Sequence, residues 1–302
     1  MQTIEKPLEA QGIQVSKSPL KNRFARLLRV KQWAKNGVVL TALLFSGKFT
    51  DSKSIVMAGA ATLAFCALSS ATYILNDISD IDGDRLHPKK RFRPIPSGEI
   101  SVKSALCIAV VCSVLAITTA CFIGLNFGLT LLAYALVNLY YSTKGKHQAL
   151  VDIFCIASGF VLRVVAGAIA ISVAPSSWLL ICTSLGALYL GIEKRRQELR
   201  MPQAALQRPV LAQYSNQALL RMESLITPSL VAFYGFYTFQ NHGQWMMLTV
   251  PVVLFGIMRY QLLSESGANT EAPEEVLWTD KWIQLCIVIF AVISATVVSL
   301  HL

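Results

Sequence analysis

"SIVMAGAATLAFCALSSATYILNDISDIDGDRLHPKKRFRPIPSG" occupies residues 54–98 and combines three kinds of sequence. Residues 54–76 form an apolar run, and about 20 such residues are enough for an α-helix to cross the hydrocarbon core of a membrane. A basic segment, 89–93, lies beyond four aspartates that follow the run, namely Asp77, Asp80, Asp82 and Asp84. The stretch therefore predicts a membrane-spanning helix that ends in a cap rich in both carboxylates and cations.

Apolar runs recur along all 302 residues, of which 54% are hydrophobic and only 15% are charged. Soluble domains carry about 25% charged residues, and the mean hydropathy here is +0.52. Gly and Ala in several runs, as at 58–61 and 166–170, allow helices to pack closely in lipid. We predict an all-α integral membrane protein with nine transmembrane helices, at about 34–49, 54–76, 104–123, 125–141, 150–173, 175–192, 224–240, 245–260 and 282–302.

The net charge of +10 is explained by membrane topology and does not indicate a nucleic-acid partner. With nine spans, all of the 27 Lys and Arg residues except three fall in the N-terminal arm and in alternate loops. The exceptions are Lys48 and Lys53, on the other side, and Arg163, inside a span. Because cytoplasmic loops are rich in Lys and Arg, the N-terminus and the loops 77–103, 142–149 and 193–223 are predicted to be cytoplasmic.

The N-terminal 26 residues are polar and lack the apolar core and cleavage site of a signal peptide. We expect them to form a cytoplasmic tail that is partly disordered. The seven cysteines all fall inside predicted spans, without a CxxC pair or a Cys/His cluster. Neither a zinc site nor a disulfide framework is therefore indicated.

The aspartates at the end of the second span have the spacing of a metal site. If that helix continues past the membrane edge, Asp77, Asp80 and Asp84 share one face, beside Asn76. Oxygen ligands of this kind suit Mg²⁺, which takes one or two carboxylates and completes its shell with water and substrate phosphate. The alternative is a solvated helix end that fixes the topology, with the carboxylates paired to the nearby cations Arg85, Lys89 and Lys90.

The basic segment after the aspartates has two readings. Lys89, Arg91 and Arg93 could fix the topology and contact anionic lipids. They could equally hold a phosphate beside the metal, because one guanidinium group can donate two parallel hydrogen bonds to phosphate oxygens.

The later cytoplasmic loops hold further cations beside carboxylates. Asp152 and Arg163 are 11 residues apart, three helical turns, and so share a face. An arginine deep in a span is costly, and it either pairs with a carboxylate of another helix or holds an anionic substrate group. In "EKRRQEL", 193–199, the cations either fix the topology or form a phosphate site that Glu193 and Glu198 orient.

These residues together resemble the UbiA-type membrane prenyltransferase superfamily, from about residue 32 to the C-terminus. The first motif of that superfamily matches as Asn76-Asp77-x-x-Asp80-x-x-x-Asp84. The resemblance implies a bundle of nine helices with a central cavity, capped by the cytoplasmic loops after helices two, four and six. It also implies that the motif binds Mg²⁺ and diphosphate, and that residues 27–302 form one catalytic domain after the tail, 1–26.

One departure from the superfamily narrows the resemblance. Members that prenylate aromatic rings carry a second aspartate-rich motif in the loop equivalent to 193–223, where this chain has no aspartate. The chain instead resembles the branch of polyprenyl-phosphate phosphoribosyltransferases, which includes the decaprenyl-phosphate enzymes. The matching segments are "KQWAKN" (31–36), "YYSTKGK" (140–146), "FVLRVVAGA" (160–168), "EKRRQEL" (193–199) and "APEEVLWTD" (272–280).

The branch implies a pentosyltransferase of the bacterial plasma membrane that serves cell-wall biosynthesis, with its active site on the cytoplasmic side. The reaction moves the 5-phosphoribosyl group of 5-phosphoribosyl 1-diphosphate (PRPP) to a polyprenyl phosphate, releases diphosphate and requires Mg²⁺. No strong general base is needed, because the attacking phosphate is already anionic. Two alternatives remain, namely prenyl transfer from a diphosphate to an aromatic acceptor, and a carrier of polyprenyl phosphate without catalysis.

The expected site residues fall into three groups. The catalytic and metal-binding group is Asp77, Asp80, Asp84 and Asn76. The phosphate-binding group is Lys35, Asn36, Lys89, Arg91, Arg93, Lys144, Lys146, Arg163, Lys194, Arg195 and Arg196. The orienting group is Asp152, Glu198 and Tyr141.

Overall fold

The computed structural model describes residues 20–86, 90–201, 208–266 and 273–300, and this part of the chain contains helices and no strand. The predicted all-α class is therefore confirmed. The N-terminal half consists of α1 (Leu20–Leu27), the 3₁₀ helix η1 (Val30–Leu40), α2 (Thr41–Phe45), η2 (Lys48–Thr50), α3 (Ser52–Ser79), α4 (Ile81–Leu86), η3 (Lys90–Phe92), α5 (Val102–Ile123) and α6 (Leu125–Thr143). The C-terminal half consists of η4 (Gly145–His147), α7 (Val151–Ala170), α8 (Ser177–Leu199), η5 (Pro209–Gln213), α10 (Asn216–Met246), α11 (Thr249–Glu265), α12 (Pro273–Thr279) and α13 (Lys281–Ser299).

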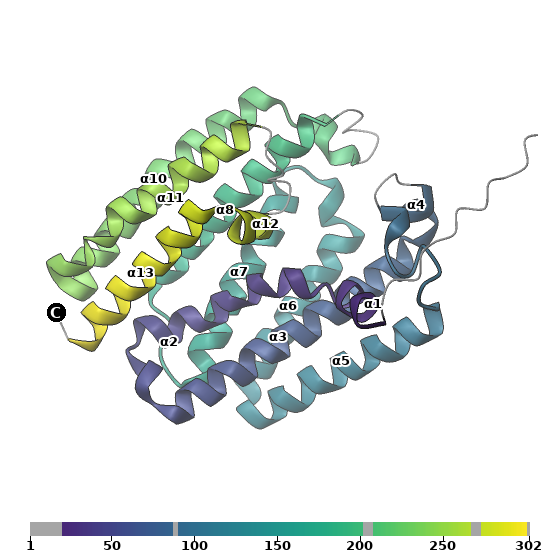
Figure 1. The fold of residues 1–302 in the computed structure, drawn as a ribbon, viewed down its shortest axis with the longest axis horizontal. Coiled ribbons are helices and arrows are strands. Elements are labelled where there is room, and N and C mark those ends of the chain that lie inside the picture. Colours follow the sequence, from purple (N-terminus) through teal and green to yellow (C-terminus); the bar gives the residue numbers. More distant parts are fainter. Residues whose placement is uncertain (1–19, 87–89, 202–207, 267–272, 301–302) are drawn as a thin grey trace, which may run out of the picture.

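The long helices contact one another in a ring. The contacts run from α3 to α5, α6, α7, α8, α10, α11 and α13, and return to α3 through α2. Figure 1 shows α10, α11 and α13 on one side of this ring and α3 and α5 on the other. Helix α7 also contacts α3 and η1, so it connects the two halves of the bundle.

The longest apolar helices are long enough to cross a membrane. Among the described residues, five segments meet that criterion: Ser52–Ser79, Val102–Ile123, Val151–Ala170, Gln244–Glu265 and Lys281–Ser299. Half of the apolar window of α7 is buried, against 22% for α5 and for α13. The outer helices thus present apolar side chains to their surroundings, as a multi-pass membrane protein does in lipid.

The residues before several helices explain where these helices begin. Asp51, Ser101, Ser215 and Asp280 each have an extended backbone, and each side chain accepts a hydrogen bond from a backbone N–H of the first turn. Such N-caps satisfy donors that have no partner within the helix. At Asp51 and Asp280 these bonds also lower the pKa of the carboxyl, after a larger contribution from the Ser54 hydroxyl and from Arg259, respectively.

The first predicted span, 34–49, is not one continuous α-helix. Residues 30–40 form the 3₁₀ helix η1, and only residues 41–45 continue as the α-helix α2. Runs of 3₁₀ helix longer than four residues are uncommon, so tertiary contacts must hold this one. Asn36 supplies such contacts, because its side chain is buried and bonds to Cys66, Ser69 and Arg163.

The small residues of α7 allow the backbone of η1 to approach. Ala166 and Ala168 are fully buried, as expected for close packing. A Cβ atom added to Gly167 would lie 2.0 Å from the carbonyl oxygen of Val39. No side chain fits at that distance, so glycine is required here for η1 to contact α7.

We predict that Gly167→Ala lowers the free energy of unfolding by about 1–3 kcal/mol, as overpacking does. The reason is that the added methyl group pushes against backbone and not against a movable side chain. Thermal unfolding in detergent measures the change. Gly186→Ala in α8 is the control, because no atom lies within 4 Å of its added Cβ. Equal stability of the two variants would contradict the close approach of η1.

Candidate active site

The aspartates of the first motif lie on two helices. Helix α3 ends at Ser79, Asp80 is its C-cap, and α4 begins at Ile81. The expectation of a single helix face shared by Asp77, Asp80 and Asp84 is therefore wrong. We refer to these three residues as the aspartate cap.

Two carboxylates of the aspartate cap nevertheless converge. One guanidinium nitrogen of Arg93 lies 3.0 Å from Oδ1 of Asp77 and 2.6 Å from Oδ2 of Asp84. Both aspartates are buried, with side chains only 5% exposed. Arg29, whose backbone is left-handed, also pairs with Asp77 and lies 4.7 Å above the ring of Tyr73. Sequence reasoning did not select Arg29, because it precedes "KQWAKN".

Asp80 contacts the loop that follows α6. Its Oδ1 lies 3.8 Å from Nζ of Lys146, which joins one predicted phosphate-binding residue to the aspartate cap. Asp80 is exposed, as is Asp82, whose carboxylate lies 3.6 Å from the Arg85 guanidinium. Lys144, the C-cap of α6, is exposed as well.

Part of the basic segment 89–93 lies beside the aspartate cap. Lys90 lies 4.0 Å from Asp84. Burial lowers the pKa of Lys90, the charges of Arg93 and Arg208 act in the same direction, and Asp84 opposes them. Arg91 is exposed and its guanidinium lies 4.8 Å from the ring of Phe92. The predicted residue Lys89 lies outside the described residues.

The donor set of the aspartate cap fits a Mg²⁺ ion. Within the described residues, no group of three or more His, Cys, Asp or Glu side chains is arranged to hold a metal by itself. Mg²⁺ does not require such a group, since one or two carboxylates together with water and substrate phosphate are its usual ligands. Asp77 and Asp84 offer two buried carboxylates at one point, where Arg93 now supplies the positive charge.

Arg163 lies deeper in the bundle among neutral groups. Its guanidinium donates to Oδ1 of Asn36 at 2.7 Å, to the hydroxyl of Tyr134 at 2.9 Å and to the carbonyl of Gly159 at 2.8 Å. It also lies 4.7 Å from the ring of Tyr134. No carboxylate pairs with Arg163 in the described ranges, so the simple reading as an ion pair between helices is not observed.

Asp152 and Arg195 form a fully buried ion pair between α7 and α8. Nε of Arg195 lies 2.6 Å from Oδ2 of Asp152, and both side chains are 0% exposed. Glu198, one turn along α8, contacts the same guanidinium. Tyr214 donates to Oδ1 of Asp152 at 2.7 Å, and Asp152 raises the pKa of Tyr214, after a larger contribution from burial. The NH2 atom of Arg195 has no hydrogen-bond partner among the described residues.

Arg208 is a further cation of this cluster that sequence reasoning did not select. One of its guanidinium nitrogens donates to the hydroxyl of Tyr141 at 2.7 Å and lies 3.7 Å from Asp152. Another lies 3.6 Å from Glu198. Its Nε has no partner among the described residues. Its charge also lowers the pKa of Lys90, after larger effects of burial and of Arg93. Its only signal in the sequence is its place in the loop that lacks aspartate.

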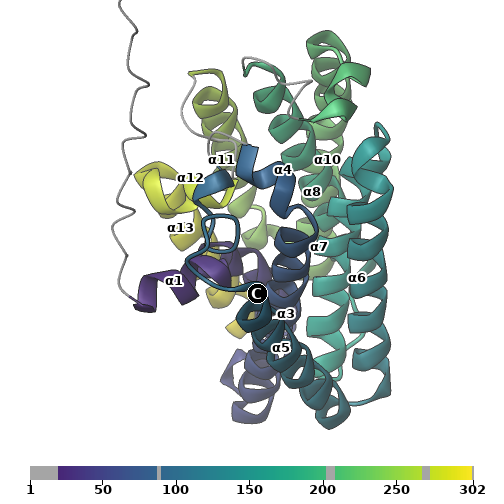
Figure 2. The ribbon, with the colours of Figure 1, turned by 90° about the vertical axis from the view of Figure 1, so that its right-hand side faces the viewer.

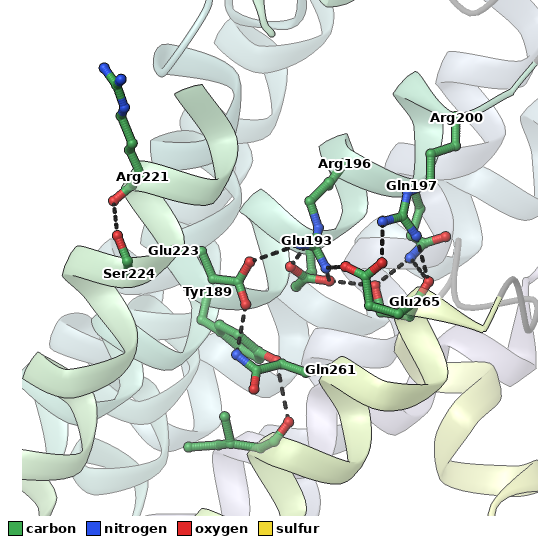
Figure 3. A network of polar contacts seen from close by, with 12 residues as sticks. Tyr189, Glu193, Arg196, Gln197, Arg200, Arg221, Glu223, Ser224, Gln261 and Glu265 are labelled. Carbon is green, nitrogen blue, oxygen red and sulfur yellow. Dashed lines mark hydrogen bonds and ion pairs between the residues drawn. The ribbon is translucent and has the colours of Figure 1, made fainter. Parts of the chain in front are cut away.

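Arg196 faces a different network from Arg195. Successive residues of an α-helix point about 100° apart, and Arg196 meets three glutamates, Glu193, Glu223 and Glu265, from α8, α10 and α11. Figure 3 shows these groups converging on its guanidinium, with Gln197 and Arg200 beside them. The run 194–196 is therefore not one continuous cationic patch.

Three further predicted residues are Asn76, Lys35 and Lys194. Asn76 is half-buried in the last turns of α3. Lys35 is half-buried on η1. Lys194 is half-buried on α8, and its charge acts on Glu198.

The chain is similar to known proteins over most of its length. The UbiA prenyltransferase family matches residues 37–297. The chain belongs to this family. Decaprenyl-phosphate phosphoribosyltransferase of Mycobacterium tuberculosis is 30% identical over 269 residues, which cover 86% of this chain and 89% of that protein. Its counterpart in Corynebacterium glutamicum is 31% identical over 286 residues, 88% of this chain and 83% of that one. The resemblance to this branch of the family is thus confirmed.

Solved structures of the UbiA family share the fold. A UbiA homolog from Archaeoglobus fulgidus bound to DMAPP and Mg²⁺ superposes with a TM-score of 0.71 and 20% identity, covering 92% of this chain and 99% of that one. At this identity the match establishes the fold only.

We predict that Arg196→Met lowers the free energy of unfolding by about 3–5 kcal/mol, because it leaves buried carboxylates without their shared cation. Thermal unfolding in detergent measures the loss. Adding Glu193→Gln should restore part of the stability by removing one unpaired charge, and such a deviation from additivity reports direct coupling. Arg221→Gln is the matched control, since the Arg221 side chain points away from the network (Figure 3) and is exposed. Strictly additive effects would contradict the shared network.

Proposed function

We propose that this UbiA-family protein transfers the 5-phosphoribosyl group of PRPP to a polyprenyl phosphate, giving polyprenyl-phosphoryl-5-phosphoribose and diphosphate. Relatives named decaprenyl-phosphate phosphoribosyltransferase match it over nearly its full length. The observation that carries the proposal is the composition of the 193–223 loop. It has no aspartate and instead contains Arg195, which pairs with Asp152, and Arg208. The charge of Arg208 also acts on Lys90, which lies 4.0 Å from Asp84. A substrate pair with three phosphate-bearing positions requires cations there, where a second metal site would require carboxylates.

We further propose the topology that this reaction needs. Residues 27–302 form one catalytic domain of nine membrane helices around a central cavity, and residues 1–26 form a cytoplasmic tail. The aspartate cap and the Arg195 cluster face the cytoplasm, where soluble PRPP is available, and the host membrane is the bacterial inner membrane. The placement of Lys and Arg in alternate loops supports this orientation.

In this proposal the aspartate cap holds the leaving group. Asp77 and Asp84, with Asp80 and Asn76 nearby, would hold Mg²⁺, which when bound neutralises charge on the diphosphate. Arg29 and Arg93 already contact these carboxylates and would donate to diphosphate oxygens. Lys146, next to Asp80, adds a further cation on the same side.

Asp152, Glu198 and Tyr141 would orient two further cations, Arg195 and Arg208. Asp152 and Glu198 fix the guanidinium of Arg195, and Tyr141 fixes that of Arg208. NH2 of Arg195 and Nε of Arg208, which have no hydrogen-bond partner among the described residues, would donate to phosphate oxygens. A polyprenyl phosphate oxygen, already anionic, attacks C1 of the ribose as the bond to diphosphate breaks. Catalysis then rests on positioning and on electrostatic stabilisation.

The direct test is diphosphate release by the purified protein with Mg²⁺ and labelled PRPP, with and without polyprenyl phosphate. We expect release to depend on the lipid and the label to enter the organic phase. Asp77→Asn should reduce the rate at least about 100-fold, because several kcal/mol of charge stabilisation at the metal is lost. Asp82→Asn is the control from the same motif, since Asp82 is 92% exposed and away from the convergence point.

Three results would contradict the proposal or a part of it. Full activity of Asp77→Asn would remove the metal assignment. Turnover of a prenyl diphosphate with an aromatic acceptor, and none with PRPP, would establish prenyl transfer instead. Lipid binding without any diphosphate release would indicate a carrier.

We expect Arg208→Gln to raise the KM for PRPP at least about tenfold, as loss of a charge-assisted hydrogen bond to phosphate does, with a smaller effect on kcat. Arg208→Lys should recover part of the affinity because it keeps the charge. Steady-state kinetics at varied PRPP measures both. Arg221→Gln, an exposed arginine elsewhere, should behave like the wild type. An unchanged KM in active Arg208→Gln would exclude contact with the donor.

A further inference from the structure

A cavity lies at the end of the bundle opposite the aspartate cap. Helix α3 has 28 residues and so is about 42 Å long at 1.5 Å per residue. Figure 2 shows α4 at one end of the bundle and the beginning of α3 at the other. The cavity has a volume of about 330 Å³ and is lined by η2, the first turns of α3 and the end of α7.

The cavity is lined by two lysines, Lys48 and Lys53, which the predicted topology places on the non-cytoplasmic side. Of the 27 Lys and Arg residues, the predicted spans leave only Lys48 and Lys53 on this side, and both line the cavity. Lys48 is half-buried, and its Nζ donates to the carbonyl of Ile171 at 3.0 Å. An ammonium group has three donors, so this bond leaves Lys48 able to donate further. Since basic residues are disfavoured on this side, their convergence indicates a specific use.

Asp51 is the one carboxylate among the described residues that line the cavity, and it can offset only one of the two lysine charges. Asp51 is the N-cap of α3, and its oxygens accept hydrogen bonds from the backbone of Lys53 and from the backbone and hydroxyl of Ser54. The three charged side chains together leave a net positive charge. Ser54 and Ser172 add hydroxyl groups to the lining.

A groove with both polar and apolar lining residues continues from this cationic cavity. A second cavity of about 260 Å³ shares Ile123, Ile169 and Ser172 with the first and extends to the turn between α5 and α6. Beside that turn, Phe122 and Leu125 are 75% and 78% exposed. This cationic pocket lies beside exposed apolar side chains at the end of membrane-spanning helices. The two parts match the charged headgroup and the apolar chain of a lipid.

We infer that this pocket binds the headgroup phosphate of an anionic phospholipid, with the Lys48 and Lys53 ammonium groups on the phosphate and the acyl chain along the α5–α6 turn. The site is separate from the proposed reaction and does not depend on it. Free inorganic phosphate would offer the same oxygens, but it would make no use of the exposed apolar side chains of Phe122 and Leu125 beside the adjoining groove.

The test is photo-crosslinking of the full-length protein in neutral-lipid nanodiscs, using phosphatidylglycerol that carries a diazirine in one acyl chain. Peptide mapping should place labels on the peptide that contains Phe122 and Leu125. Lys48→Gln with Lys53→Gln should reduce these labels at least about tenfold, because two charge-assisted contacts are lost. Lys103→Gln with Arg221→Gln, which removes the same charge from exposed positions, should leave them unchanged. The matching phosphatidylcholine probe should label this peptide at least fivefold less.

Equal labelling by the two probes, or full labelling of the Lys48/Lys53 double variant, would overturn the inference. Loss of labelling in excess inorganic phosphate would assign the pocket to free phosphate and overturn the lipid source. If the double variant does not fold, Lys53→Gln alone decides the question, because Lys53 is exposed. That variant should still reduce the labels severalfold.

Discussion

The buried ion pair between Asp152 and Arg195 is the interaction that joins the start of α7 to the end of α8, and the neighbouring polar contacts depend on it. Neither side chain is exposed to solvent. Removing two charges from water costs several kcal/mol per ion, and the attraction between the two charges and additional hydrogen bonds offset this cost. Tyr214 completes the coordination of Asp152, and the same tyrosine hydroxyl accepts from the backbone N–H of Leu150. The start of α7, the end of α8 and the segment after η5 are thereby fixed relative to one another.

The same constraint explains why the charged clusters have such different compositions. Around Arg196, three glutamates share one buried guanidinium, so this network joins α8, α10 and α11 and leaves its cation little capacity for a substrate. Around Arg195 the carboxylates contact one side of the guanidinium, and NH2 has no hydrogen-bond partner in the part of the chain that the structure describes. Neighbouring arginines in "EKRRQEL" thus differ in what they can bind, because helical rotation turns one toward glutamates and the other toward the proposed substrate site.

Much of this fold can be predicted from the sequence because apolar runs and capping residues determine it locally. The predicted spans at 104–123 and 125–141 meet at Gly124, as α5 and α6 do. The orienting role of Asp152 stays a prediction, although Asp152 lies beside Arg195. Features that depend on distant contacts could not be predicted. The 3₁₀ geometry of η1 depends on Asn36 and on Gly167 in α7. The sequence around Arg208 has no periodic pattern, and only the folded chain brings Arg208 to Tyr141.

Arg163 differs from the other buried arginines because its partners are neutral. A guanidinium among amide, hydroxyl and carbonyl groups is solvated by dipoles, and aromatic faces add a weaker attraction. None of these removes its net charge, and in a medium of low dielectric constant that charge acts over a longer range than in water. Arg163 lies 11 residues, about 16 Å along α7, below Asp152. In the proposed reaction, a polyprenyl phosphate enters from the apolar interior, where Arg163 would be the first cation that it meets. Arg93 and Arg195 are already paired with carboxylates. Arg163 has no carboxylate partner among the described residues, so its charge would favour the lipid phosphate over the soluble donor.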